Sequence, residues 1–114
     1  PVADVELRNS QTGRAVSGIL MLIDSGADVT LLPRQAVAQI GVDVEPGPGI
    51  ELLGFDGSRS AASVVTLDVV WLTRMYRGRY LLTESDRGIL GRDVLNHIKI
   101  ILDGPAQAWD ASVS

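Results

Sequence analysis

The chain has 114 residues, of which 46% are hydrophobic and 21% charged, and its formal net charge is −4. This length suits one domain with one modest core, and the composition is that of a folded domain rather than a disordered tail. The negative charge disfavours a phosphate backbone or anionic lipid, so we expect no nucleic acid partner and no membrane contact within this chain. With no cysteine and one histidine, His97, a single chain excludes disulfides, thiolate chemistry and a His-rich metal site.

The beginning of the chain predicts two strands. Residues 2–7 alternate apolar and polar side chains, as a half-buried strand does. The aliphatic run 15–23 is too short for a typical buried helix, so we interpret it as a strand that enters the core. Asp24 follows directly at the end of this strand.

A helix and a hairpin are predicted next. A short apolar run ends at Pro33, which suits the first turn of a helix, and Gly41 is placed to end that helix. Residues 50–65 then predict a hairpin, because Asp56-Gly57 favours a tight turn at its tip.

The following stretch predicts further strands. Residues 65–71 have a period of two, and Gly78 predicts a turn that leads into a return strand over residues 80–83. Arg74, Arg77 and Arg79 gather on this hairpin, where they predict a solvated surface rather than a nucleic-acid patch.

The last third predicts a buried edge over residues 89–91, a short helix from Arg92 and a strand over residues 98–102, whereas residues 104–114 form a tail of uncertain structure. The expected fold is therefore all-β: a single domain over residues 1–114, built as a small closed barrel of short, mainly antiparallel strands with one or two short helices.

Asp24-Ser25-Gly26 is the triplet that could carry chemistry. As an isolated triplet it favours a turn, in which Asp24 accepts backbone hydrogen bonds. The functional interpretation makes Asp24 one half of a carboxylate pair that activates water, with Gly26 allowing a substrate backbone to come close.

Two motifs together carry a resemblance to a known family. Leu22-Ile23-Asp24-Ser25-Gly26-Ala27-Asp28 is followed, after a flap-like hairpin, by Ile89-Leu90-Gly91-Arg92-Asp93. This order resembles the retropepsin family of aspartic proteases, in which an aliphatic lead-in precedes Asp-Thr/Ser-Gly-Ala and a later aliphatic pair and glycine precede Arg-Asp or Arg-Asn. The helix after Pro33 looks more like cellular and bacterial relatives than compact viral enzymes.

The resemblance assigns roles to residues of this chain. It implies Asp24 as the catalytic acid, Ser25 as the hydroxyl that grips across a dimer, and Gly26, Ala27 and Asp28 as the floor that bonds substrate. It implies a pairing of Arg92 with Asp28 and a reach of Arg8 to the partner's Asp28, although both arginines could instead be solvated surface charges. The implied substrate contacts are Leu22, Val29, Leu31 and Ile89 on the cleft walls, and Gly54, Phe55, Asp56 and Gly57 on the flap.

The mechanism requires a second copy of the chain. Aspartic protease chemistry needs two carboxyls about 3 Å apart that share one proton, and this chain has one such motif. We therefore expect a C2 homodimer that hydrolyses extended, hydrophobic peptide segments without a metal or cofactor. The alternative is a catalytically silent dimerisation or peptide-binding module.

The sequence leaves localisation open. The apolar runs fall short of a membrane span, so the chain as given is expected to be soluble. Because it starts at Pro1 rather than Met, excision from a larger or membrane-anchored precursor also remains open.

Overall fold

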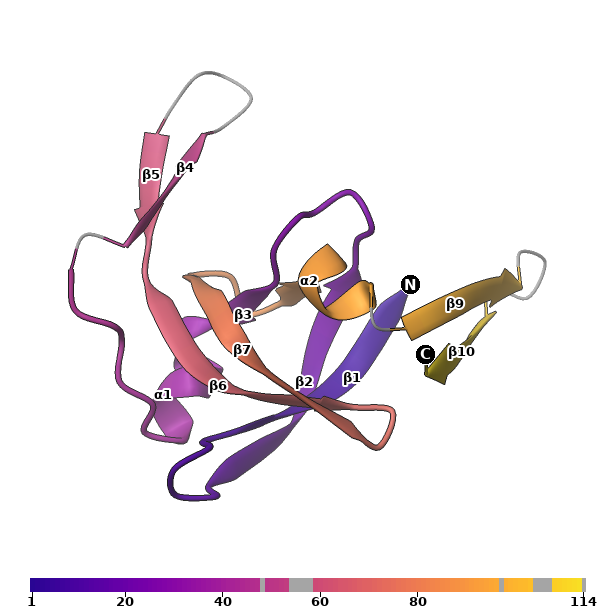
Figure 1. Ribbon diagram of the computed structural model, residues 1–114, viewed down its shortest axis with the longest axis horizontal. Helices are drawn as coiled ribbons and strands as arrows, with labels where there is room; N and C mark the ends of the chain where they lie inside the picture. The colour runs from indigo at the N-terminus through magenta and orange to yellow at the C-terminus, as the bar shows by residue number, and fades with distance from the viewer. Residues whose placement is uncertain (48, 54–58, 97, 104–107, 114) are drawn as a thin grey trace.

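The computed structural model describes residues 1–47, 49–53, 59–96, 98–103 and 108–113, and it consists mostly of strands (Figure 1). Six strands form a closed barrel in the order β1-β2-β8-β3-β7-β6, and β6 pairs with β1 to close it. The barrel strands are β1 (Val2–Arg8), β2 (Ala15–Ile23), β3 (Leu31–Pro33), β6 (Val64–Trp71), β7 (Arg74–Thr83) and β8 (Gly88–Leu90). The predicted small barrel is thus confirmed.

Two helices and two hairpins complete the chain. The helices are α1 (Arg34–Gln39) and α2 (Arg92–Leu95), and the hairpins are formed by β4 (Ile50–Leu53) with β5 (Arg59–Ala62) and by β9 (Ile98–Asp103) with β10 (Ala108–Val113). Pro33 stands directly before α1, and Gly41 follows its end with a φ of +68°, as their residue types predict. Neither helix in the described part of the chain is long and apolar enough to cross a membrane.

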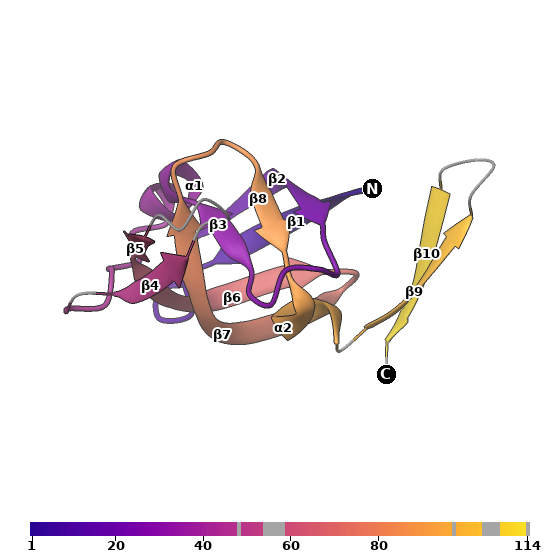
Figure 2. The same ribbon diagram turned by 90° about the horizontal axis from the view of Figure 1, so that it is seen from above.

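The barrel interior holds the hydrophobic core. On β1, alternate residues Ala3, Val5 and Leu7 are buried, as the period of two predicts. Met21, Leu67 and Leu90 meet them from other strands, and α1 adds Ala36 and Val37. Because Met21 of β2 and Leu90 of β8 both belong to this core, it holds the two strands side by side at one end of the barrel (Figure 2).

Most strand pairs are antiparallel, but β2 pairs with β8 and β3 with β7 in parallel. Parallel neighbours need crossover connections between segments distant in sequence. The β2–β8 pairing brings the residues after Ile23 next to the residues after Leu90. This crossover creates the candidate site.

The predicted turn at Gly78 is wrong, because β7 runs without interruption through this residue. The chain reverses instead at Leu72-Thr73, where both residues have positive φ values of 54° and 62°, as in a two-residue primed turn. Gly78 serves packing: a Cβ there would lie 3.2 Å from the ring of Tyr80. Burial raises the pKa of the Tyr80 hydroxyl far above its ordinary range, and this hydroxyl donates to the carbonyl of Tyr76 at 2.5 Å.

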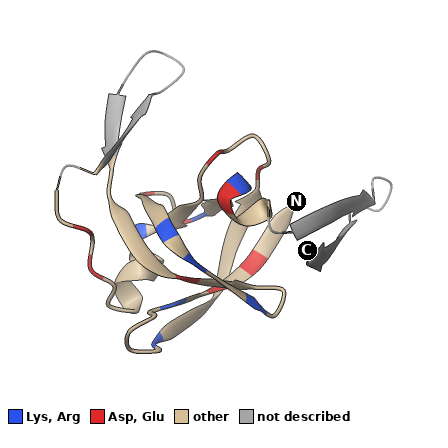
Figure 3. Cartoon of the chain, in the orientation of Figure 1, with Lys and Arg blue, Asp and Glu red and all other residues tan. Residues whose placement is uncertain are grey.

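Two of the three arginines of β7 are paired with acids. Arg77 binds the buried carboxylate of Asp68, and Arg79 binds Glu45, whose pKa is lowered by that hydrogen bond. Figure 3 shows acidic and basic positions spread over the barrel, with both signs meeting on α2. The expected solvated hairpin therefore fits better than a basic nucleic-acid patch.

Candidate active site

Asp24 lies at the end of β2, where two neighbours hold its backbone. The Asp24 N–H donates to the carbonyl of Leu90 at 3.1 Å, and the Ile23 N–H donates to the carbonyl of Pro1 at 3.0 Å. The end of β2 is thus fixed between β8 and the start of the chain. The Asp24 side chain is exposed at this end of the barrel.

The triplet after Ile23 forms a tight turn. Asp24 Oδ1 accepts the N–H of Gly26 at 2.9 Å, and the Asp24 carbonyl accepts the N–H of Ala27 at 3.2 Å. This is the turn that Asp-Ser-Gly predicts. The turn and catalytic interpretations are compatible, because one oxygen of the carboxylate makes the turn bond and a carboxylate has two.

A buried hydrogen-bond network anchors the far side of this loop. Thr30 is fully buried, its N–H donates to Asp93 Oδ2 at 3.1 Å, and its hydroxyl donates to Asp93 Oδ1 at 2.6 Å. The same hydroxyl accepts the N–H of Gly91 at 3.0 Å. These bonds tie the loop after β2 to the start of α2.

Gly91 allows the two segments to touch. A Cβ at this position would lie 2.5 Å from the carbonyl carbon and oxygen of Val29 and 2.9 Å from the oxygen of Ala27, so only glycine fits. The next residue, Arg92, donates its N–H to the Ala27 carbonyl at 2.8 Å. The two sequence motifs therefore meet through their backbones.

The pairing expected between Arg92 and Asp28 is present. The Arg92 and Asp28 side chains are 53% and 75% exposed in the single chain. An exposed pair contributes little to the stability of one chain. The contribution of the Arg92–Asp28 pair to contacts between two copies stays a prediction.

Arg8 lies far from Asp24 of its own chain. It lies opposite Ala15, whereas Val2, at the other end of the same strand, lies opposite Leu22 next to Asp24. Six residues of strand, about 20 Å, separate the two ends. Within the chain, Arg8 binds Glu6 of its own strand at 2.6 Å. The expected contact is with the partner's Asp28, which one chain does not test, so it stays a prediction.

Apolar side chains flank Asp24 on the surface. Leu22 and Val29 are 41% and 40% exposed, and Leu31 and Ile89 are half-buried. Ile89 is the register partner of both Leu22 and Leu31, so these three residues are neighbours across strands. They supply an apolar surface beside the carboxylate.

The flap prediction is tested only in part. The hairpin is confirmed, with β4 and β5 in antiparallel register from Ile50 opposite Ala62 to Leu53 opposite Arg59. The predicted contacts at its tip, Gly54, Phe55, Asp56 and Gly57, lie outside the described residues.

Comparison with solved structures gives two similar folds. EIAV protease, solved in complex with the inhibitor HBY-793, superposes with a TM-score of 0.64 at 21% identity, over 84% of this chain and 85% of that one. The protease of simian foamy virus (mac) superposes with a TM-score of 0.57 at 17% identity, over 84% of this chain and 92% of that one. This chain has the retropepsin-like fold. Sequence comparison finds no matching family model and no matching curated protein.

Sequence reasoning missed two residues that position the candidate site, Thr30 and Asp93. Thr30 lies within a short aliphatic run. Nothing in the sequence alone shows that its hydroxyl is buried or that it binds the Asp93 carboxylate. Asp93 lay within the quoted second motif, but only the pairing across the crossover reveals its partner.

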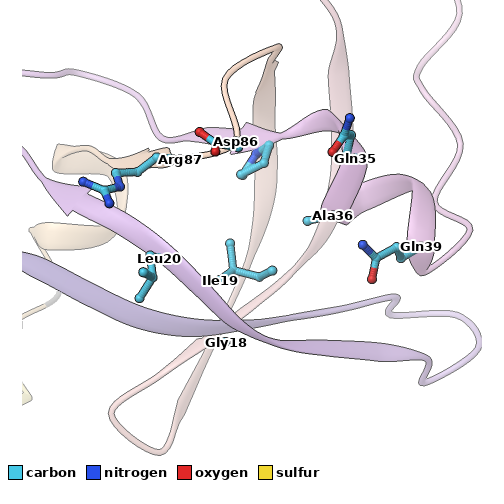
Figure 4. Close-up of a pocket in the computed structure, with 9 residues that line it drawn as sticks. Gly18, Ile19, Leu20, Gln35, Ala36, Gln39, Asp86 and Arg87 are labelled. Atoms are coloured by element: carbon cyan, nitrogen blue, oxygen red, sulfur yellow. The ribbon is translucent and has the colours of Figure 1, made fainter.

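A pocket of about 350 Å³ lies elsewhere, between β2 and α1 (Figure 4). Its walls are Gly18, Ile19, Leu20, Pro33, Gln35, Ala36, Gln39, Asp86 and Arg87. None of the expected site residues lines it. The described residues contain no group of three or more acidic, histidine or cysteine side chains that could hold a metal ion.

Proposed function

We propose that the chain is an aspartic endopeptidase in which two copies each supply Asp24. The observation that carries the proposal is the exposed Asp24 carboxylate, held in an Asp-Ser-Gly turn at the end of β2 and braced from α2. The retropepsin-like fold of the chain is the fold of proteases in both compared structures.

The proposed reaction uses two carboxyls in different protonation states. Two aspartates about 3 Å apart cannot both ionise, so they share one proton. The ionised carboxylate takes a proton from a bridging water, and that water attacks the scissile carbonyl. The protonated carboxyl donates a hydrogen bond to the carbonyl oxygen and stabilises the non-covalent tetrahedral intermediate.

The surroundings of Asp24 suggest the substrate class. Leu22, Val29, Leu31 and Ile89 would form apolar walls, so the preferred substrates are extended segments with hydrophobic side chains around the cleaved bond. Ser25 would bond across the dimer, and Gly26, Ala27 and Asp28 would bond the substrate backbone. The β4–β5 hairpin would close over the bound peptide.

Asp24→Asn tests the assignment. The change removes the ionisable group but keeps the size and the turn acceptor, so peptide cleavage should fall to background while the dimer and its thermal unfolding are preserved. Cleavage is measured with a library of hydrophobic peptides at several pH values. Asp86→Asn is the matched control, because Asp86 is an exposed carboxylate in the turn before β8 and lines the distant pocket.

Two outcomes would contradict the proposal. Turnover by Asp24→Asn comparable to that of the unmodified chain would remove Asp24 from catalysis. Tight binding of intact peptides by the unmodified chain, without cleavage at any pH, would favour the catalytically silent binding module.

A further inference from the structure

One edge of β2 is only partly covered by its neighbour. β2 has nine residues, but β8 pairs with residues 21–23 alone. On that side, no strand in the described part of the chain pairs with residues 15–20, whose other side pairs with β1. Residues 15–20 contain no proline and no charged side chain, the residues that commonly protect a free strand edge. The edge therefore offers backbone groups to an added strand.

The pocket of about 350 Å³ opens onto this edge, and we call it the edge groove. Two successive residues of β2 line it: Ile19, which packs against the core, and Leu20, which is 45% exposed. Successive side chains of a strand point to opposite faces of the sheet, so a cavity that touches both lies at the strand edge. α1 forms the opposite wall and leaves the groove open (Figure 4).

The α1 wall of the edge groove suits a peptide backbone. Gln35 and Gln39 line it from exposed positions four residues apart, which places them on the same side of the helix. Figure 4 shows Gln39 extending from α1 on the side of the groove that faces Ile19. Glutamine amides both donate and accept hydrogen bonds, as peptide groups require. Leu20 adds an apolar surface for a side chain of the bound segment.

A β-bulge limits how much of the edge can pair regularly. Glu6 of β1 lies opposite two residues of β2, Ser17 and Gly18, and Gly18 has a φ of +74°. Regular pairing on the free edge is therefore possible at Ile19 and Leu20, directly before the residues that β8 covers. An added segment would be short and would continue the line of β8.

The edge groove is continuous with the candidate active site. Leu20 and Leu22 lie on the same face of β2, and Leu22 stands beside Asp24. Four residues of strand, about 13 Å, separate Leu20 from Asp24. An extended polypeptide at Asp24 that follows β2 therefore needs about four further residues to reach the groove.

We propose that the edge groove is a second peptide-binding site, in which an extended segment of the protein substrate pairs with the free edge of β2. Addition of a strand to an exposed sheet edge is a common mode of peptide recognition. The inference rests on the proposed function in one respect, because it takes the bound polypeptide to be the substrate. It goes further by placing substrate contacts outside the cleft at Asp24.

Neighbouring residues of α1 provide a matched test. Gln39 and Ala38 are both exposed, but only Gln39 lines the edge groove. In the full chain carrying Asp24→Asn, Gln39→Trp fills the groove and should raise the dissociation constant for reduced, carboxymethylated lysozyme, an unfolded polypeptide, by about tenfold. Ala38→Trp adds the same bulk outside the groove and should change it by less than about twofold. Fluorescence anisotropy of the labelled polypeptide measures both values, and circular dichroism checks the fold.

A second measurement locates the bound polypeptide. The backbone amide signals of Gly18, Ile19 and Leu20 should shift when the unfolded polypeptide is added to the ¹⁵N-labelled Asp24→Asn chain. If Gln39→Trp prevents folding, Gln39→Ala replaces it and should raise the dissociation constant by about threefold. Absence of binding, equal effects of the tryptophans at both positions, or shifts confined to the surroundings of Asp24 would overturn the proposal. Self-association of the chain through residues 15–20 would assign the edge to a second copy and would overturn it as well.

Failure of this proposal is separable from failure of the proposed enzyme. Binding that is weakened by Gln39→Trp, in a chain whose unmodified form cleaves no peptide, supports the edge groove and contradicts the endopeptidase. If both proposals hold, Gln39→Trp in the otherwise unmodified chain lowers kcat/KM for the unfolded polypeptide about tenfold relative to kcat/KM for a peptide of about six residues, which is too short to reach the groove. Cleavage in which this ratio does not change supports the endopeptidase and contradicts the edge groove.

Discussion

At the scale of single residues, Thr30 links the two halves of the site. Its hydroxyl donates to Asp93 and accepts from the Gly91 N–H, and the side chain is fully buried. Removing this hydroxyl would leave a buried donor and a carboxylate oxygen without their partner. Each such loss costs on the order of 1–3 kcal/mol.

Thr30→Val is therefore predicted to lower the free energy of unfolding by about 2–4 kcal/mol, although its volume is nearly unchanged. Thr30→Ser keeps the hydroxyl and should lose less, about 1 kcal/mol for the missing methyl group. Urea unfolding of both variants measures the difference. Equal losses for the two would show that the hydroxyl bonds contribute no more to stability than packing of the methyl group does.

Predictions for single residues were correct where the interacting groups lie close together in the sequence. Asp24-Ser25-Gly26 predicts the turn that is observed, because the side chain and the bonded N–H are two residues apart. The reach of Arg8 to the partner's Asp28 stays a prediction, because it involves a second copy; within the chain Arg8 binds Glu6. Arg92 and Asp28 meet as expected, but their exposure could not be read from sequence.

At the scale of elements, the β6–β7 pair contains two similar ion pairs that differ in burial. Arg77 and Arg79 each use their guanidinium fork to bind one carboxylate. The Asp68 side chain that receives Arg77 is 2% exposed, whereas the Glu45 side chain that receives Arg79 is 36% exposed. The two arginines are equally exposed, at 64%.

Arg77→Ala is predicted to destabilise the barrel clearly more than Arg79→Ala does, because it leaves the buried Asp68 carboxylate without its cation. Arg79→Ala should have little effect on the free energy of unfolding, as expected for an exposed pair. Chemical denaturation at neutral pH measures both. If the two substitutions cost the same, burial of Asp68 would not be the factor that sets the strength of its pair.

Elements were predictable where hydrophobic periodicity was long and regular. The patterns of residues 2–7, 15–23 and 65–71 correspond to β1, β2 and β6. The β6–β7 turn was missed, because Leu72 and Thr73 adopt positive φ without the glycine or asparagine that normally signals it. Gly78 was misread as a turn, because its role is to make room for the Tyr80 ring.

At the scale of the whole molecule, pairing across the barrel was the least predictable feature. The closed barrel could be expected from many short strands, but the parallel pairings of β2 with β8 and β3 with β7 depend on contacts between distant segments. The β2–β8 pairing unites the two sequence motifs and creates the candidate site. The separate C-terminal hairpin was also unexpected, because the second strand follows a segment without a regular apolar pattern.

The central claim is that one active site takes one Asp24 from each of two chains. Unmodified and Asp24→Asn chains are mixed in equal amounts, unfolded together, refolded and assayed at fixed total protein well above the dimer dissociation constant. Random pairing makes about one quarter of the dimers fully unmodified, so activity should fall to about one quarter of that of the unmodified chain. Retention of about half the activity would mean that each chain works alone and would contradict the shared site.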